Sequence, residues 1–177
     1  AKEIGVPVKL LVGKDYQATM DDIGKNTVQM AYLTPTTYPK AERQNPEAAV
    51  RPIVKFKEGG SATYRSAIIV RAGSPIAGLA DIKGKKFAFG SEQSTSSHLM
   101  PRSMLIAAGI NIDKDLKEIK FTGSMGNVVG AVASGMMDAG GLQETVAEQA
   151  EKQGKVKILA RSGDIPQFPI CVNKNLS

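Results

Sequence analysis

Short apolar segments alternate with polar turns and amphipathic stretches along most of the chain. Apolar or alternating runs predict strands, and apolar residues three or four positions apart predict helices. Strands are expected at residues 6–12, 28–33, 50–56, 62–71, 85–89, 116–121, 136–141, 156–160 and 170–172. Helices are expected at 17–24, 34–43, 99–108, 128–134 and 143–153, with a helical turn at 79–84 and the tail of a helix over 1–5. This alternation predicts an α/β fold with a largely parallel sheet.

The central stretch, residues 84–110, predicts a strand, a polar loop and a helix with Pro101 near its start. Proline is tolerated there because its missing N–H has no intrahelical partner in a first turn. Ser94, Thr95, Ser96 and Ser97 lie where the loop meets the helix. Hydroxyls beside unpartnered N–H groups can hold an oxyanion such as phosphate or a carboxylate. Taken alone, the segment also fits a simple N-cap with solvated neighbours.

The same arrangement occurs at two further places. Thr34, Thr36 and Tyr38 follow one predicted strand, with Thr34 as the expected N-cap and Pro35 as the first helical residue. Ser124 and Met125 lie in the loop after the strand at 116–121. Ligands of open α/β sheets bind outside the carboxyl ends of the strands. Three polar helix starts at that edge favour an anion site over simple capping.

Composition narrows the class of protein. The net charge of +6 suits an anionic partner, but the basic residues are spread out and there is no tryptophan, so nucleic acid is disfavoured. Cys171 is the only cysteine and His98 the only histidine. An internal disulfide is therefore excluded, and so are the usual zinc clusters. Neither a cofactor nor a metal is expected.

Six segments together resemble one family, the periplasmic solute-binding proteins of phosphate, phosphite and phosphonate ABC transporters. They follow the family's order and span nearly the whole chain: GKDY (13–16), MAYLTPTTY (30–38), YRSAIIVR (64–71), LADIKGKKFAFG (79–90), STSSHLMPRSML (94–105) and FTGSMGNVVGAVASGMMDAG (121–140).

The resemblance implies a type II periplasmic-binding-protein fold of two lobes joined by a strand hinge. Lobe one would hold residues 1–67 and 169–177, and lobe two residues 68–168. The hinge would lie near 68–71 and again near 165–172. The family begins with a further strand and helix and ends with further helices, so the chain is expected to be truncated at one or both ends.

The resemblance also implies the ligand-binding residues. The phosphorus-bound oxygens would lie on Ser94, Thr95 and Ser96. The remaining implied contacts come from hydroxyls, cleft walls and neighbouring backbone: Thr34, Thr36, Tyr16, Tyr64, Ser124 and Met125.

The chain departs from the family pattern at several positions. Met125 stands where the family usually has a donor histidine, and His98 is the residue that could replace that donor. Glu144 could hold a ligand amino group, but Phe168 stands where a second acid is expected, so an aminophosphonate is disfavoured.

The function expected from the resemblance is non-catalytic capture of a phosphorus oxyanion for an ABC permease. The protein would be periplasmic and monomeric, with a lipid anchor left open. One alternative is a ligand-sensing domain of a signalling receptor. The other is a phosphoester-processing enzyme with Ser96 or Thr95 as nucleophile and His98 as base.

Overall fold

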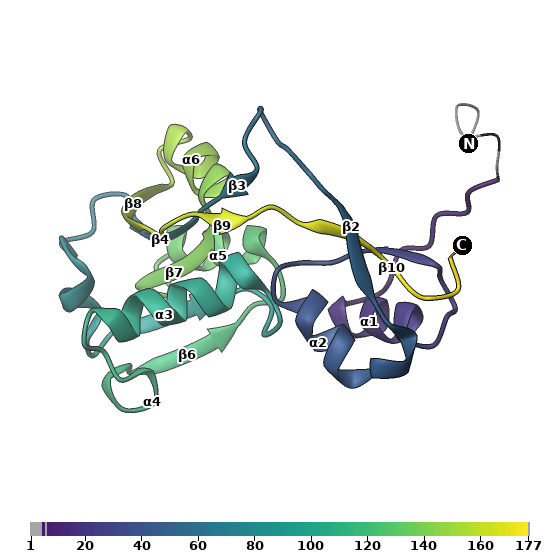
Figure 1. Ribbon diagram of the computed structural model, residues 1–177. Helices are drawn as coiled ribbons and strands as arrows, with labels where there is room; N and C mark the ends of the chain where they lie inside the picture. The colour runs from purple at the N-terminus through teal and green to yellow at the C-terminus, as the bar shows by residue number, and fades with distance from the viewer. Residues whose placement is uncertain (1–4, 6, 177) are drawn as a thin grey trace. The chain divides into compact units, whose positions relative to one another are not determined.

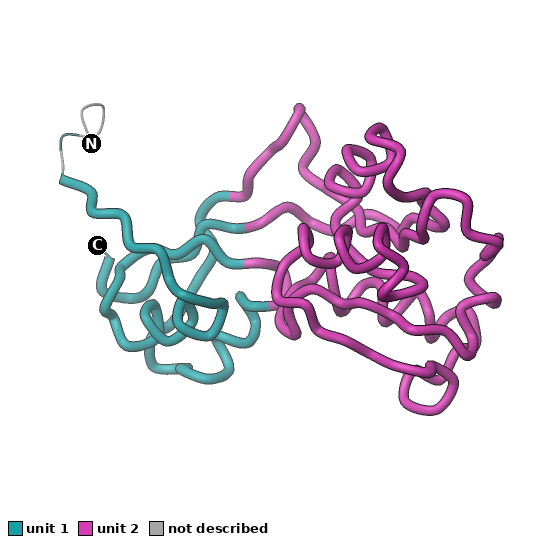
Figure 2. Tube along the Cα trace, turned by 180° about the vertical axis from the view of Figure 1, so that it is seen from behind, with its two compact units in different colours: residues 1–33, 37–54, 169–177 teal, residues 34–36, 55–168 magenta. Residues whose placement is uncertain are grey.

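The structure is a computed structural model that describes residue 5 and residues 7–176 (Figure 1). They form two compact units (Figure 2). Unit 1 comprises residues 1–33, 37–54 and 169–177, and unit 2 comprises residues 34–36 and 55–168. The expected helical tail over Ala1–Gly5 lies outside the described residues except for Gly5.

Unit 1 is a small sheet with helices packed on it. Its strands run in the order β1–β10–β2, with β1 (Met30–Tyr32) antiparallel to β10 (Pro169–Val172) and β2 (Arg51–Lys55) on the far side of β10. The other elements are α1 (Tyr16–Gly24), α2 (Thr37–Gln44) and the 3-10 helix η1 (Pro46–Ala48). Asp15 caps α1, because its carboxylate accepts the Ala18 N–H at 2.8 Å.

The strand expected at residues 6–12 is wrong over its described part. Residues 7–12 form no strand, and Val8, Leu10 and Val12 are 65%, 84% and 86% exposed. An alternating apolar pattern forms a strand only when a neighbouring strand provides hydrogen-bond partners for its backbone. A single extended segment in water has no such partners and is not stabilised as a strand.

Unit 2 contains a five-stranded sheet in the order β6–β5–β7–β4–β8. The strands are β4 (Ser66–Arg71), β5 (Lys86–Phe89), β6 (Glu118–Phe121), β7 (Ala139–Gln143) and β8 (Val156–Arg161). β5 pairs in parallel with β6 and β7, whereas β4 pairs antiparallel with β7 and β8. The sheet is therefore mixed, not largely parallel as expected. A continuous apolar run such as that of β4 reflects burial on both faces of the sheet, and here such a strand has antiparallel partners.

Helices cover both faces of this sheet, as Figure 1 shows. On one face, α5 (Met125–Ala133) and α6 (Glu144–Lys152) bury Val128, Val132 and Ala147 against β4, β7 and β8. On the other face, α3 (Met100–Ala107) and α4 (Ile112–Asp115) lie against β4 and β5. The two cores explain the long apolar run of β4, whose Ala67, Ile68, Ile69 and Val70 are fully buried.

Residues 68–71, where the resemblance placed the hinge, are part of β4 in the unit 2 sheet. The chain passes from unit 1 to unit 2 after Val54, not after residue 67, and returns after Phe168. The remaining elements of unit 2 are short: β3 (Thr63–Tyr64) paired with β9 (Ile165–Pro166), the 3-10 helix η2 (Leu79–Ile82) and the π-helix η3 (Thr95–Leu99). Within the described residues, none of the helices has the length and apolar character needed to cross a membrane.

Candidate functional site

Three helix starts in unit 2 follow the carboxyl ends of the parallel strands β5, β6 and β7. η3 follows β5 and runs directly into α3, α5 follows β6, and α6 follows β7. The residues at the N-cap positions are Ser94, Ser124 and Gln143. Because these strands are parallel neighbours, their helix starts lie along one edge of the sheet, where N–H groups favour negative charge.

The hydroxyl segment Ser94–Ser97 is the buried part of this edge. Its four residues are between 2% and 7% exposed. The Ser94 hydroxyl accepts the Ser97 N–H at 3.2 Å, which is an N-cap bond. The sequence predicted a helix beginning at Leu99, and the structure adds one π-helical turn before it, over Thr95–Leu99. Such turns occur frequently at functional sites.

Thr36 lies against this turn. The Thr36 N–H donates to the Thr95 hydroxyl at 3.2 Å, and the two hydroxyls are 2.7 Å apart. Thr34 and Thr36 are buried, and the segment Thr34–Thr36 belongs to unit 2. Whichever hydroxyl donates to the other, one hydroxyl proton of the pair is left for a further acceptor. The first two predicted hydroxyl clusters therefore do meet.

The helix after this segment begins later than predicted. α2 starts at Thr37, so Thr34 is not its N-cap. Thr34–Thr36 instead forms the connection between β1 and α2, and its middle residue is Pro35. The residue before a proline is disfavoured in the helical region, which opposes a helix that includes Thr34.

Ser124 is connected to the same edge through backbone hydrogen bonds. Gly123 N donates to Gly90 O at 3.1 Å, and Gly90 N donates to Ser97 O at 2.9 Å. The Ser124 hydroxyl caps α5 by accepting the Asn127 N–H at 3.2 Å. Ser124 is exposed and Met125 is half-buried, so the third predicted cluster lies beside the first, Ser94–Ser97, with its surface open to solvent.

Glu144, the first residue of α6, is held by an arginine. Its carboxylate accepts from Arg161 Nε at 2.6 Å, and the same guanidinium lies 3.8 Å from Glu148. Glu144 N donates to the carbonyl of Arg65 at 2.9 Å. Asp164 raises the pKa of the Arg65 guanidinium, first through a hydrogen bond and then through its charge. The charge of Glu144 raises this pKa further. Glu144 is therefore part of a cluster of opposite charges.

His98 lies within η3, with its ring against two phenylalanines. The ring centroid is 5.0 Å from that of Phe89 and 4.8 Å from that of Phe121, both edge-on. His98 Nδ1 is 2.6 Å from the carbonyl of Glu92. A carbonyl only accepts, so this nitrogen carries the proton and cannot serve as a base toward Thr95 or Ser96.

The two predicted tyrosines lie in different units. Tyr64 is 7% exposed in β3, and its ring packs edge-on against Phe168 at 5.4 Å. Tyr16 is the first residue of α1 in unit 1 and is half-buried.

One contact of the hydroxyl turn escaped the sequence reasoning. Ser66, fully buried in β4, donates its hydroxyl to the carbonyl of Ser96 at 2.6 Å. A lone polar residue at the start of an apolar strand was the available signal, because buried hydroxyls need a partner.

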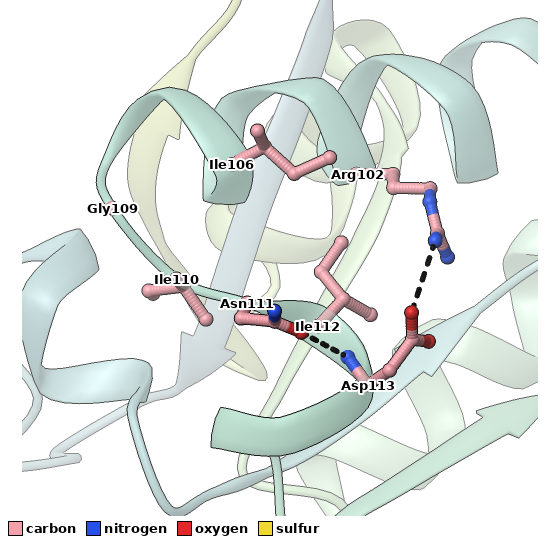
Figure 3. Close-up of a pocket in the computed structure, with 7 residues that line it drawn as sticks. All are labelled: Arg102, Ile106, Gly109, Ile110, Asn111, Ile112 and Asp113. Carbon is pink, nitrogen blue, oxygen red and sulfur yellow. Dashed lines mark hydrogen bonds and ion pairs between the residues drawn. The ribbon is translucent and has the colours of Figure 1, made fainter.

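Other cavities and clusters do not coincide with the predicted residues. A hollow of about 370 Å³ lies between the end of α3 and α4, with an Arg102–Asp113 ion pair of 3.8 Å at its rim (Figure 3). It is lined by Arg102, Ile106, Gly109, Ile110, Asn111, Ile112 and Asp113. Among residues 5 and 7–176, no group of three His, Cys, Asp or Glu side chains is arranged to hold a metal ion.

Comparison with known families identifies the family of this chain. All 177 residues match the family model described as "ABC transporter, phosphonate, periplasmic substrate-binding protein". The chain belongs to this family. The expected resemblance is thus confirmed at the level of the family.

Named relatives of this periplasmic substrate-binding family differ in their ligands. The chain is 31% identical over 156 residues to a probable ABC transporter phosphite binding protein, PhnD1, of Prochlorococcus marinus, covering 84% of this chain and 51% of that protein. It is 28% identical to the phosphate-import protein PhnD of Mycolicibacterium smegmatis, covering 99% of this chain and 59% of that protein. The chain therefore spans about half the length of the curated relatives that it matches.

A solved structure supports the fold. PhnD1 of Prochlorococcus marinus in complex with methylphosphonate superposes with a TM-score of 0.83 at 24% identity, over 99% of this chain and 67% of that one. The fold is that of type II periplasmic binding proteins, as the sequence predicted.

Proposed function

We propose that this chain binds a phosphorus oxyanion at the Ser94–Ser97 turn, as the ligand-binding part of a non-catalytic solute-binding protein. The observation that carries the proposal is the buried turn at a helix start, where Ser94, Thr95, Ser96 and Thr36 gather hydroxyls beside N–H groups. Aligned N–H and O–H donors in a dry site can neutralise an anion without a cationic side chain. Membership in the family supports this ligand class.

The proposed transport role follows from the same family. The partner would be the permease of an ABC importer, and the protein would work outside the cytoplasm. Binding needs donors and no nucleophile, and the hydroxyl turn gathers N–H and hydroxyl donors. The arrangement therefore supports capture of the anion.

In the binding machinery, Thr95 would be the central hydroxyl. If Thr36 donates to it, Thr95 accepts two hydrogen bonds, which polarise its own O–H toward a ligand oxygen. Ser94 and Ser96 would add a hydroxyl each, and the exposed start of α5 at Ser124 would lie beside the ligand. Thr34, Tyr64, Met125, His98 and Glu144, all in unit 2, remain proposed neighbours of the ligand.

A thermal-shift screen tests the proposal and identifies the anion. The 177-residue chain is heated with phosphate, phosphite, methylphosphonate, 2-aminoethylphosphonate, sulfate or acetate. A ligand at a hundred times its Kd stabilises the folded state by about 2.7 kcal/mol, which raises the melting temperature by several degrees. At least one phosphorus oxyanion should do so, and more strongly than acetate at the same ionic strength. Equal, small shifts for all six anions would contradict the proposal.

A further inference from the structure

The backbone of the hydroxyl turn lacks one internal hydrogen-bond donor because of a proline. In η3 the N–H groups reach back five residues, from Leu99 to the Ser94 carbonyl at 3.1 Å and from Met100 to the Thr95 carbonyl. Pro101 occupies the next position and has no N–H. It therefore cannot donate to Ser96, five residues back, or to Ser97, four residues back.

Donors from the sheet take the place of the missing N–H. The Ser66 hydroxyl donates to the Ser96 carbonyl at 2.6 Å, and Gly90 N donates to the Ser97 carbonyl at 2.9 Å. Ser66 Oγ also lies 3.2 Å from the Leu142 carbonyl, but one O–H serves mainly the nearer acceptor. Each carbonyl that Pro101 leaves open thus has a donor from β4 or from the residue that follows β5.

Two glycines allow the turn to lie directly on the sheet. A Cβ on Gly90 would overlap the Ser97 side chain, with Ser97 Cβ at 2.8 Å, and a Cβ on Gly141 would overlap the ring of Pro101. The turn therefore packs closely on β7 and on the end of β5, and β4, the neighbour of β7, reaches it with the Ser66 hydroxyl.

Ser66 itself is held in a fixed position. Its N–H donates to the Ser162 hydroxyl at 2.9 Å, and Ser162 N donates to the Ser66 carbonyl at 2.9 Å. Ser66 is fully buried, and Ser162 is 9% exposed. Because both the N–H and the carbonyl of Ser66 are hydrogen-bonded, its side chain has a fixed position. Its hydroxyl therefore holds the Ser96 carbonyl in a defined place.

We propose that Ser66 is a positioning residue for anion binding, which fixes the π-helical turn that Pro101 leaves open and so aims the N–H and hydroxyl groups of Ser94–Ser97. This inference rests on the proposed function. Ser66 does not touch the anion; it acts through the Ser96 carbonyl. Loss of its hydroxyl leaves a buried carbonyl without its donor, and the turn relaxes toward α-helical geometry, in which Ser96 accepts from Met100.

Isothermal titration with methylphosphonate tests the role of Ser66. Ser66→Ala should bind at least tenfold more weakly than the unchanged chain, at a temperature where circular dichroism shows both to be folded. Ser134→Ala is the control, because it removes a serine hydroxyl that donates to a backbone carbonyl, that of Ala131, but contacts neither Ser66 nor the turn. It should change the affinity less than twofold even where it lowers the melting temperature. Should Ser66→Ala not fold, Ser66→Cys keeps the volume with a weaker donor and should show a several-fold loss.

The outcomes separate the two proposals. Equal affinities of Ser66→Ala and the unchanged chain, or equal losses in Ser66→Ala and Ser134→Ala, would overturn the positioning role alone. Failure of the unchanged chain to bind any anion of the screen would overturn the proposed function and this role with it.

A second measurement tests the link to Pro101. Pro101→Ala supplies the missing N–H, so Ser66→Ala should lower the melting temperature less in the Pro101→Ala background than in the natural sequence. Equal decreases in the two backgrounds would show that Ser66 and Pro101 act independently and would contradict the inference.

Discussion

Cys171 shows how burial alone sets the chemistry of one residue. It lies in β10 opposite Ala31 and is fully buried in the unit 1 core. Desolvation disfavours the thiolate and raises the pKa of the thiol from 9.0 to about 11. Such a thiol is protonated, inaccessible and unreactive at neutral pH.

Cys171 should make the stability of the protein depend on pH in the alkaline range. Below pH 9 the thiol is protonated in both the folded and the unfolded state. Above it the unfolded state loses its proton first, so stability falls from about pH 9 to pH 11, by about 2 to 3 kcal/mol for a shift of this size. The difference in free energy of unfolding between the natural chain and Cys171→Ala, measured by urea denaturation, isolates this contribution from that of the lysines. A difference that stays constant from pH 8 to pH 11 would contradict the assigned pKa.

The hydroxyl residues show what local sequence can and cannot reveal. Ser94–Ser97 could be found because a cluster of hydroxyls before helix formers is a local signal. The pairing of Thr36 with Thr95 and of Ser66 with Ser96 joins residues 59 and 30 positions apart. Such contacts depend on strand order, which no short segment encodes.

At the scale of elements, β7 is shaped by the helices on both of its faces. A Cβ on Gly140 would come within 2.6 Å of Val128 in α5, and one on Gly141 would overlap Pro101 in α3. Two neighbouring glycines in one strand thus permit close packing on opposite faces. A glycine inside a strand often marks such an approach.

Gly141→Ala should destabilise the protein by about 1 to 3 kcal/mol, because the added methyl overpacks the contact between β7 and α3. Gly130→Ala is the control. Gly130 lies in α5 with nothing within 4 Å of its added Cβ, and alanine there should stabilise the helix by up to about 1 kcal/mol. Urea denaturation measures both. If Gly141→Ala is as stable as the natural chain, the close contact does not exist.

The elements themselves were largely predictable, whereas their pairing was not. The periodicities placed β4, β5, β8 and α6 within a few residues of their observed bounds. They did not find the π-helical turn, because it arises from Pro101 and from donors on other strands. They also placed a strand at residues 6–12, where the apolar pattern lacks a partner in the described chain.

At the scale of the whole molecule, the division into two units differs from the predicted lobes. Residues 55–67 belong to unit 2, together with Thr34–Thr36. The predicted boundary came from the family pattern, which does not determine to which of the two sheets a given strand belongs. The clustering of buried residues does: Ala67–Val70 lie in the two cores of unit 2, while the core of unit 1 is formed by Met20, Ile23, Ala31, Leu33, Ala41, Ala48, Val50 and Cys171.

The family, the fold and the position of the hydroxyl turn lead to one central claim, that Ser94–Ser97 binds a phosphorus oxyanion. Isothermal titration of the Ser94→Ala/Thr95→Ala variant with methylphosphonate tests it most directly. Loss of an N-cap costs about 1 kcal/mol, so the variant should stay folded by circular dichroism while binding becomes undetectable. The control Ser103→Ala/Ser134→Ala removes two exposed hydroxyls and should bind like the natural chain. An unchanged Kd in the Ser94→Ala/Thr95→Ala variant would contradict the claim.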